Sequence, residues 1–256
     1  MLKKITLLST CLFFLAFSGC ELLEGVELPD TELSESEIID GLKEALKVGT
    51  DTAVTQLTKV NGFYSDAVIK ILLPEEASSV ITKLNSTTAG KAIYDNALKP
   101  TVEKLIQSLN KSAEDAAVKA KPIFVNAITG ITISDGINIL QGSDTAATSY
   151  LKSKTYSDLK TAFTPDINTS LEKPLVASQS CNTIWNSFVT TYNTTANSPF
   201  NSFLDLDPIE DTNLASFVTG KALDGLFYKV GLEEKAIRED PVARVTEILE
   251  KVFGSL

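Results

Sequence analysis

Residues 34–62 read SESEIIDGLKEALKVGTDTAVTQLTKVNG and decide the fold class. Ser34 and Glu37 have the spacing of a capping box, in which each side chain bonds the backbone of the other residue at a helix N-terminus. Asn61-Gly62 is a turn signal that ends the segment. Between these ends, apolar residues recur at the 3.6-residue period of a helix that buries one face; they are Ile38, Leu42, Ala45, Leu46, Ala53, Leu57 and Val60.

Similar start and stop signals follow along the rest of the chain. Pro74 fits a first helical position, Pro100 breaks or kinks a helix, and Asp240-Pro241 combines an N-cap with a first-turn proline. Long alternating patterns typical of strands are missing. We therefore predict an all-α fold, a single domain of about eight to ten helices.

Several boundaries can be predicted more closely. We expect Ser134 to cap a helix over Asp135–Leu140, and Ser143 or Asp144 to cap the next one, through Tyr150. Gly231 is expected to end a helix, and residues 193–211 to form the longest loop. The stripe predicted for the last helix, which Gly254 would end, comprises Val242, Val245, Leu249 and Val252.

The N-terminus has the order of a bacterial lipoprotein signal. Lys3 and Lys4 precede an apolar run that is too short, at about 13 residues, to span a bilayer, and Ser18-Gly19 leads into Cys20. We predict a signal peptide over residues 1–19, lipidation of Cys20, a tether over residues 20–33 and a helical domain over residues 34–256. The expected location is the cell envelope, anchored in the outer membrane or in a membrane leaflet that faces the periplasm.

The amino-acid composition of the chain restricts the partners and the reactions that we expect for it. The chain of 256 residues carries a net charge of −10, which disfavours nucleic acid as a partner. It contains no histidine, which removes the commonest general base and zinc ligand. Cys181 would be the one cysteine of the domain, spaced for helix packing with Trp185 and Phe188. We expect no cofactor, no metal and no catalytic residue that a motif identifies.

The arginines are the most unusual feature of the domain. The chain has 23 basic residues but only two arginines, Arg238 and Arg244, both in IREDPVAR. Arginine is favoured where a planar fork grips a carboxylate or phosphate. The pair predicts either a structural clasp that holds the last helices, through a carboxylate such as Glu114, Asp224 or Glu234, or an anion-binding site.

Several segments resemble the bacterial domain-of-unknown-function family 4197. They include NGFYSDAVIKILLP (61–74), LNKSAEDAA (109–117), ISDGINILQGSDTAATSYL (133–151) and EEKAIREDPVARVTEILEKVFG (233–254). The resemblance implies an all-α fold on exported or lipidated envelope proteins and no established activity. The residues at matching motif positions, which we take as candidate site residues, are Asn110, Glu114, Asp135, Asp144, Arg238, Asp240 and Arg244.

These observations predict a lipid-anchored envelope protein that acts as a binding or structural module. Its expected partners are the membrane, through the lipid on Cys20, and another envelope protein. Two alternatives stay open. One is a carrier of an apolar small molecule inside the helical bundle, and the other is a carboxylate-based hydrolase, for which the chain offers many acidic residues but no histidine.

Overall fold

The computed structural model describes residues 33–174, 176, 178–199, 201–204, 206–210 and 213–254. The predictions for the signal peptide and Cys20 lie outside these residues. The described chain is all-α, as predicted, with one isolated bridge between Val176 and Gln179. Its helices are α1 (Glu35–Leu57), α2 (Glu75–Asn85), α3 (Thr88–Ile93), η1 (Tyr94–Leu98), α4 (Lys99–Ala117), α5 (Ala120–Thr129), α6 (Ile133–Leu140), α7 (Ala146–Glu172), α8 (Cys181–Ala196), α9 (Asn201–Leu204), α10 (Leu214–Glu239), η2 (Pro241–Ala243) and α11 (Glu247–Phe253).

Helix α1 forms as its sequence predicts. The Ser34 side chain accepts from the Glu37 N–H while the Glu37 carboxylate accepts from the Ser34 N–H, which is the predicted capping box. Its buried face packs against α5, α6, α10 and α11. Asn61 takes a positive φ of 61° in the turn that follows α1.

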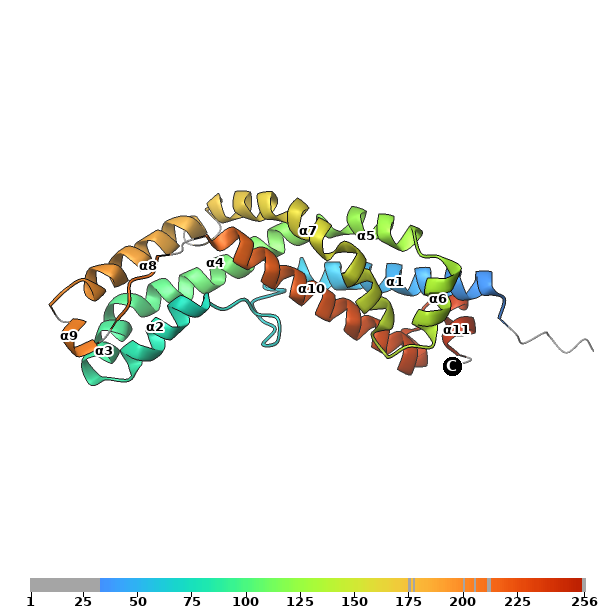
Figure 1. The fold of residues 1–256 in the computed structure, drawn as a ribbon, viewed down its shortest axis with the longest axis horizontal. Coiled ribbons are helices and arrows are strands. Elements are labelled where there is room, and N and C mark those ends of the chain that lie inside the picture. The colour runs from blue at the N-terminus through green and yellow to red at the C-terminus, as the bar shows by residue number, and fades with distance from the viewer. Residues whose placement is uncertain are drawn as a thin grey trace, which may run out of the picture. The chain divides into compact units, whose positions relative to one another are not determined.

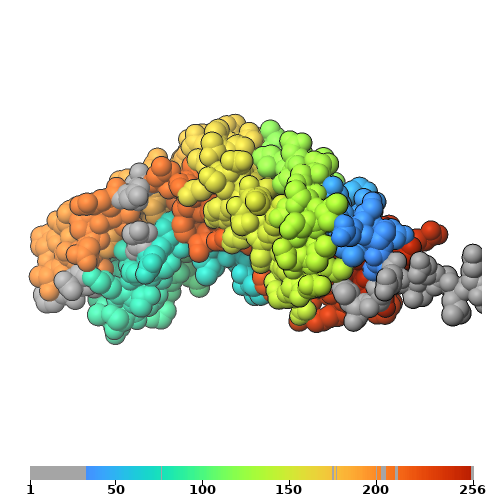
Figure 2. Space-filling view, turned by 45° about the vertical axis from the view of Figure 1, so that its right-hand side comes forward, coloured from blue at the N-terminus to red at the C-terminus, as the bar shows by residue number. Residues whose placement is uncertain are grey.

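The longest helices pack on one another around a shared core. Helix α10 contacts α1, α4 and α7, and α4 also contacts α7 and α8 (Figure 1). In the space-filling view, α5, α6 and α7 form much of the surface between the α8 region and the start of α1 (Figure 2). The core contains several fully buried aromatic side chains, among them Phe63, Phe124, Trp185, Phe188 and Tyr192.

Three predicted boundaries are wrong. Helix α6 is capped by Thr132, whose hydroxyl accepts from the Asp135 N–H, and not by Ser134. Helix α7 begins after Thr145 with no side-chain cap of its own, and it continues past Tyr150 to Glu172. Helix α10 does not end at Gly231 but continues to Glu239, and Glu234 and Ile237 beyond the glycine are buried. Gly231 packs closely on α7, since a Cβ there would lie 3.4 Å from the Thr145 side chain.

The C-terminal stripe and the long loop also differ from expectation. Helix α11 starts only at Glu247, so Val242 and Val245 are 86% and 68% exposed instead of buried. Leu249 and Val252 are buried, and Gly254 ends the helix as predicted. The expected loop over residues 193–211 is shorter, because α8 extends to Ala196 and α9 forms within it.

Residues 63–73 form no helix and instead fold back over the bundle. Turns carry the chain from Phe63 to Ile69, and an extended stretch continues to Pro74. Phe63, Ile69, Ile71 and Leu73 are buried there. This segment lies between α1 and α2 in the chain and borders the groove described below.

Within the part of the chain that the structure describes, no single helix has the length and apolar character to cross a membrane. Helices α5 and α6 meet that standard only as a pair, and the chain bends by 104° between them.

Candidate functional site

Two regions contain the residues of interest, and the first lies at the end of α10. Glu234 and Arg238, one turn apart on this helix, form an ion pair with side chains only 4% and 8% exposed. Arg238 donates from Nη2 at 3.0 Å and from Nε at 3.1 Å to the Glu234 Oε1 atom. A buried pair of this kind is tolerated only when its remaining hydrogen-bonding atoms also find partners.

Glu234 finds those partners at the N-terminus of α7. Its two carboxylate oxygens accept from the Ala147 N–H at 2.9 Å, the Thr148 N–H at 2.7 Å and the Thr148 hydroxyl at 2.7 Å. The first N–H groups of a helix have no partner within it, and the positive end of the helix dipole favours a carboxylate. Glu234 therefore caps α7 from a different helix.

Arg238 performs the complementary role at the C-terminus of α6. Its Nη1 donates to the Leu140 carbonyl at 3.2 Å, and its Nη2 donates to the Ile139 carbonyl at 3.0 Å. The last carbonyls of a helix are unpaired and carry partial negative charge. One ion pair on α10 thus joins the end of α6 to the start of α7.

Arg244 adds a third helix end. Its Nε donates to the Ile237 carbonyl and its Nη2 to the Arg238 carbonyl, both at 2.9 Å, where α10 ends. Asp240 orders the intervening turn by accepting from the Val242 N–H at 2.9 Å. We call Glu234, Arg238 and Arg244 the helix-end clasp. Both guanidinium groups face acceptors of their own chain, so the geometry favours the structural interpretation over an anion site.

The remaining predicted residues do not join the clasp. Asp135 belongs to the α6 capping box and accepts from the Tyr150 hydroxyl at 3.1 Å. Its bonds with Thr132, above all the one from the hydroxyl, lower its pKa. Asp144 is exposed ahead of α7, where Glu234 provides the cap instead. Asp224 pairs with Lys152 at 3.2 Å.

Asn110 links α4 to the extended stretch. Its side-chain Oδ1 accepts from the Ile71 N–H at 2.8 Å, and its Nδ2 donates to the Ile71 carbonyl at 2.7 Å. The same Nδ2 also donates to the Ile106 carbonyl. One turn further along α4, Glu114 is buried beside Lys111, and among the described residues its Oε1 has no hydrogen-bond partner. Asn110 is thus the predicted residue that helps to shape the second region.

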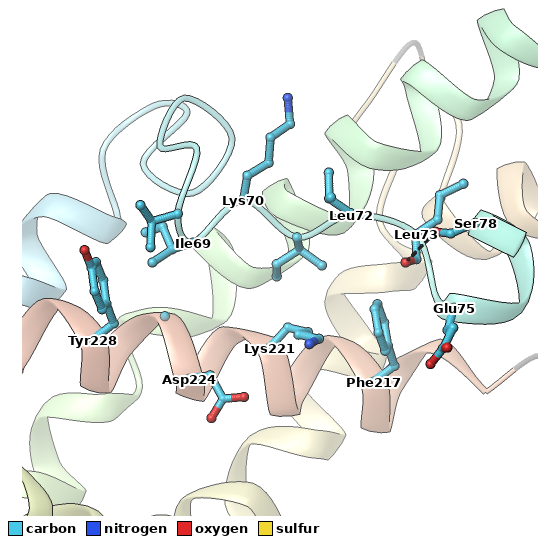
Figure 3. A pocket seen from close by; sticks show the side chains of 13 residues that line it. Ile69, Lys70, Leu72, Leu73, Glu75, Ser78, Phe217, Lys221, Asp224 and Tyr228 are labelled. Carbon is cyan, nitrogen blue, oxygen red and sulfur yellow. Dashed lines mark hydrogen bonds between the residues drawn. The ribbon is translucent and has the colours of Figure 1, made fainter. Parts of the chain in front are cut away.

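The second region is a groove of about 590 Å³ between residues 68–73 and α10. Residues 68–73 form one wall together with Glu75 and Ser78 at the start of α2. The other wall is one face of α10, where the lining residues follow helical spacing; they are Phe217, Lys221, Asp224, Gly225 and Tyr228. Figure 3 shows Ile69 to Leu73 alongside α10, with Lys70 and Leu72 pointing away from it. We refer to this feature as the groove.

Two contacts hold the extended stretch against α10. Gly225 permits a close approach, since a Cβ there would lie 3.0 Å from Phe63 and 3.2 Å from Ile69. Lys229 forms an ion pair with Asp66 at 2.6 Å, and this contact is the main reason that the Asp66 pKa is lowered. These contacts position residues 63–69 against α10 next to the groove.

Sequence reasoning missed the groove. Asp224 was named as a possible partner of the arginines, and Phe217, Lys221 and Tyr228 were not singled out as site residues. Two signals were present: Val68 and Leu72, which are large apolar side chains on a segment without helical period, and the spacing of residues 217, 221, 224 and 228.

The cysteine and the carboxylates of the described chain are the groups that redox or metal chemistry would use. No group of three or more Cys, Asp and Glu residues is arranged to hold a metal ion among these residues. Cys181 is buried in α8, and burial raises the pKa of its thiol to about 12. Such a cysteine packs as a small apolar residue and is a poor nucleophile at neutral pH.

The fold and these two regions define an all-α domain with a buried helix-end clasp and an open groove. Residues 32–254 match the model of the family described as "Protein of unknown function (DUF4197)", and the chain belongs to this family. The resemblance that the sequence motifs carry is thereby confirmed. No curated protein and no solved structure shows a significant match to the chain.

Proposed function

We propose that this protein is a lipid-anchored binding module of the cell envelope that docks a partner in the groove. The observation that carries the proposal is the combination of apolar and charged side chains around one open groove. Val68, Leu72 and Tyr228 line it, and each is substantially exposed although large and apolar. Exposed apolar surface rimmed by polar residues is typical of sites where another molecule docks.

The lining also weighs against the two alternatives. A carrier of an apolar molecule needs an apolar enclosure, whereas Lys70, Glu75, Lys221 and Asp224 all line this groove. A carboxylate-based hydrolase needs two carboxylates that act on one bond. Glu75 and Asp224 line the groove, but Asp224 is already paired with Lys152.

Crosslinking in living cells tests the proposal. The neighbours of the complete chain would be captured with a chemical crosslinker and compared with those of Cys20→Ser, which cannot be lipidated. We expect a discrete partner that depends on Cys20 and is lost in Phe217→Ser, a change in the groove.

The matched control is Val242→Ser, which changes an exposed apolar residue outside the groove. If Phe217→Ser and Val242→Ser captured the partner equally well, the groove would not be the docking surface. If Cys20→Ser captured the same partner as the unmodified chain, the role of the anchor would be wrong.

A further inference from the structure

Along one edge of the extended stretch, residues 69–73, the backbone is hydrogen-bonded to Asn110. Both hydrogen-bonding groups of Ile71 are engaged by the side-chain amide of Asn110, at 2.8 Å and 2.7 Å. An amide that accepts from an N–H and donates to the C=O of the same residue reproduces the pair of bonds that a neighbouring β-strand would make. Asn110 therefore acts as a strand partner on the α4 side.

The other edge of the same stretch has no partner. In extended chain, successive residues direct their N–H and C=O groups to opposite sides. The backbone groups of Leu72 must then point away from Asn110. Among the described residues, no hydrogen bond to the N–H or the C=O of Leu72 is present. Leu72 is 58% exposed, so this edge is accessible.

The burial of side chains agrees with a strand of this kind. Ile69, Ile71 and Leu73 are buried, while Lys70 and Leu72 between them point away from α10 (Figure 3). Strictly alternating burial is the property of a β-strand with one face on a core. The stretch thus has the side-chain alternation of a single strand, and its free edge has no backbone partner among the described residues.

The length of the α10 wall indicates how many residues of an extended peptide the groove could hold. Phe217 and Tyr228 are eleven residues apart on α10, which corresponds to about 16 Å along the helix axis. An extended chain covers that distance with about five residues. Five residues would place alternate side chains on the aromatic groups at the two ends of the groove.

The charges of the groove indicate which kind of charged residue the bound segment should carry. Within the described chain, neither Lys70 nor Lys221 has a carboxylate within ion-pair distance, although the protein as a whole carries a net charge of −10. Lys70 instead lies over the Tyr64 ring at 3.7 Å. Asp224 is neutralised by Lys152. Lys221 has neither an ion pair nor a ring contact among the described residues, so its cation complements an acidic side chain on the occupant.

We infer that the groove binds an extended, partly apolar peptide segment with an acidic residue, taken from a partner protein and added as a β-strand to the free edge of Leu72. This inference rests on the proposed function and specifies the chemistry of the partner. Strand addition takes its affinity from main-chain bonds and its specificity from pockets for alternate side chains.

The test uses a library of random twelve-residue peptides selected on the purified chain from residue 20 to residue 256. Affinities of the enriched peptides would be measured by fluorescence anisotropy for the unmodified chain, Leu72→Ala, Leu72→Pro and Lys221→Ala. Leu72→Ala removes the side chain and keeps the N–H. Leu72→Pro also removes the N–H and is compatible with extended chain.

The inference predicts that enriched peptides carry an acidic residue among apolar ones and bind Leu72→Pro about fivefold more weakly than Leu72→Ala. Lys221→Ala should weaken binding as well. Hydrogen exchange of the Leu72 amide should slow when the peptide binds the unmodified chain. This exchange measurement decides the question if Leu72→Pro does not fold.

Equal affinities for Leu72→Pro and Leu72→Ala, or an unchanged exchange rate at Leu72, would overturn strand addition. The absence of any enriched peptide would overturn it too. None of these results would affect the crosslinking in cells, in which loss of the partner in Phe217→Ser would still support the groove as a docking surface.

Discussion

The helix-end clasp and the groove use polar groups in opposite ways. At the clasp, the Glu234 and Arg238 side chains are buried and directed to partners within the chain. At the groove, Lys221 and the backbone of Leu72 have no partner among the described residues. Groups whose bonds are made inside the fold contribute to stability, while groups that are exposed and unbonded are free to bind something else.

The clasp should give the largest effect on stability. Glu234→Ala leaves the Arg238 cation buried without a counterion and removes the cap of α7, so we expect a loss of about 3 to 5 kcal/mol in the free energy of unfolding. Urea titration followed by circular dichroism measures this. Glu233→Ala is the matched control, because Glu233 lies beside Glu234 but its side chain bonds only Gln56 among the described residues. Similar losses in both variants would contradict the role of the clasp.

Asn110→Ala should rank second. It leaves the Ile71 N–H and C=O without their partner in a buried position, for which we expect about 2 to 3 kcal/mol of destabilisation. Hydrogen exchange at the Ile71 amide should become faster. Asn96→Ala is the control. The exposed Asn96 side chain donates to the carbonyl four residues before it, as Asn110 does, but among the described residues it makes no hydrogen bond to another segment of the chain. An unchanged Ile71 exchange rate would show that Asn110 does not hold the strand.

Two glycines of α10 should respond to alanine with opposite signs. Gly225→Ala forces the new Cβ against Phe63 and Ile69, and we expect a loss of about 1 kcal/mol. Gly220→Ala meets nothing closer than the Tyr156 hydroxyl at 3.9 Å, so the better helix propensity should stabilise the protein by about 0.5 to 1 kcal/mol. Thermal melting of both variants measures the difference. Stabilisation by Gly225→Ala would mean that the stretch packs less closely than described.

Acid should weaken the attachment of residues 63–73 to α10. The ion pair with Lys229 lowers the Asp66 pKa below its usual 3.8. Because the pKa is lower in the folded state, the stabilisation is present above pH 3.8 and is lost as the pH falls through the folded-state pKa. We expect Asp66→Asn to cost about 1 kcal/mol at pH 6 and less at pH 3. The free energy of unfolding of the unmodified chain and of Asp66→Asn would be measured at both pH values. A difference between them that does not change with pH would contradict this linkage.

The two regions also differ in how well the sequence predicts them. The clasp arginines stand out because they are the only two in the chain, and Glu234 was among their suggested partners. The all-α class follows from caps such as Ser34 and Glu37, whose bonds are local. Local signals fail where a distant residue provides the cap, as Glu234 does for α7, and so the start of α7 was misplaced.

The sequence carries signals of each wall of the groove but not of their meeting, because the walls are far apart in sequence. Nothing local shows that Ile71 bonds Asn110, or that Gly225 allows Phe63 to approach α10. The exposure of Val242 and Val245 has a similar origin. Arg244 bonds the end of α10 and holds residues 240–246 in a turn, although their valines have helical spacing.

The most direct test of the account places a photoactivatable amino acid at Leu72 or at Val242 of the complete chain in living cells. Both positions are exposed and apolar, but only Leu72 lines the groove. We predict a discrete crosslinked partner from position 72, lost when Lys221→Ala is added, and none from position 242. A partner captured from position 242 and not from position 72 would show that docking occurs away from the groove and would contradict the central claim.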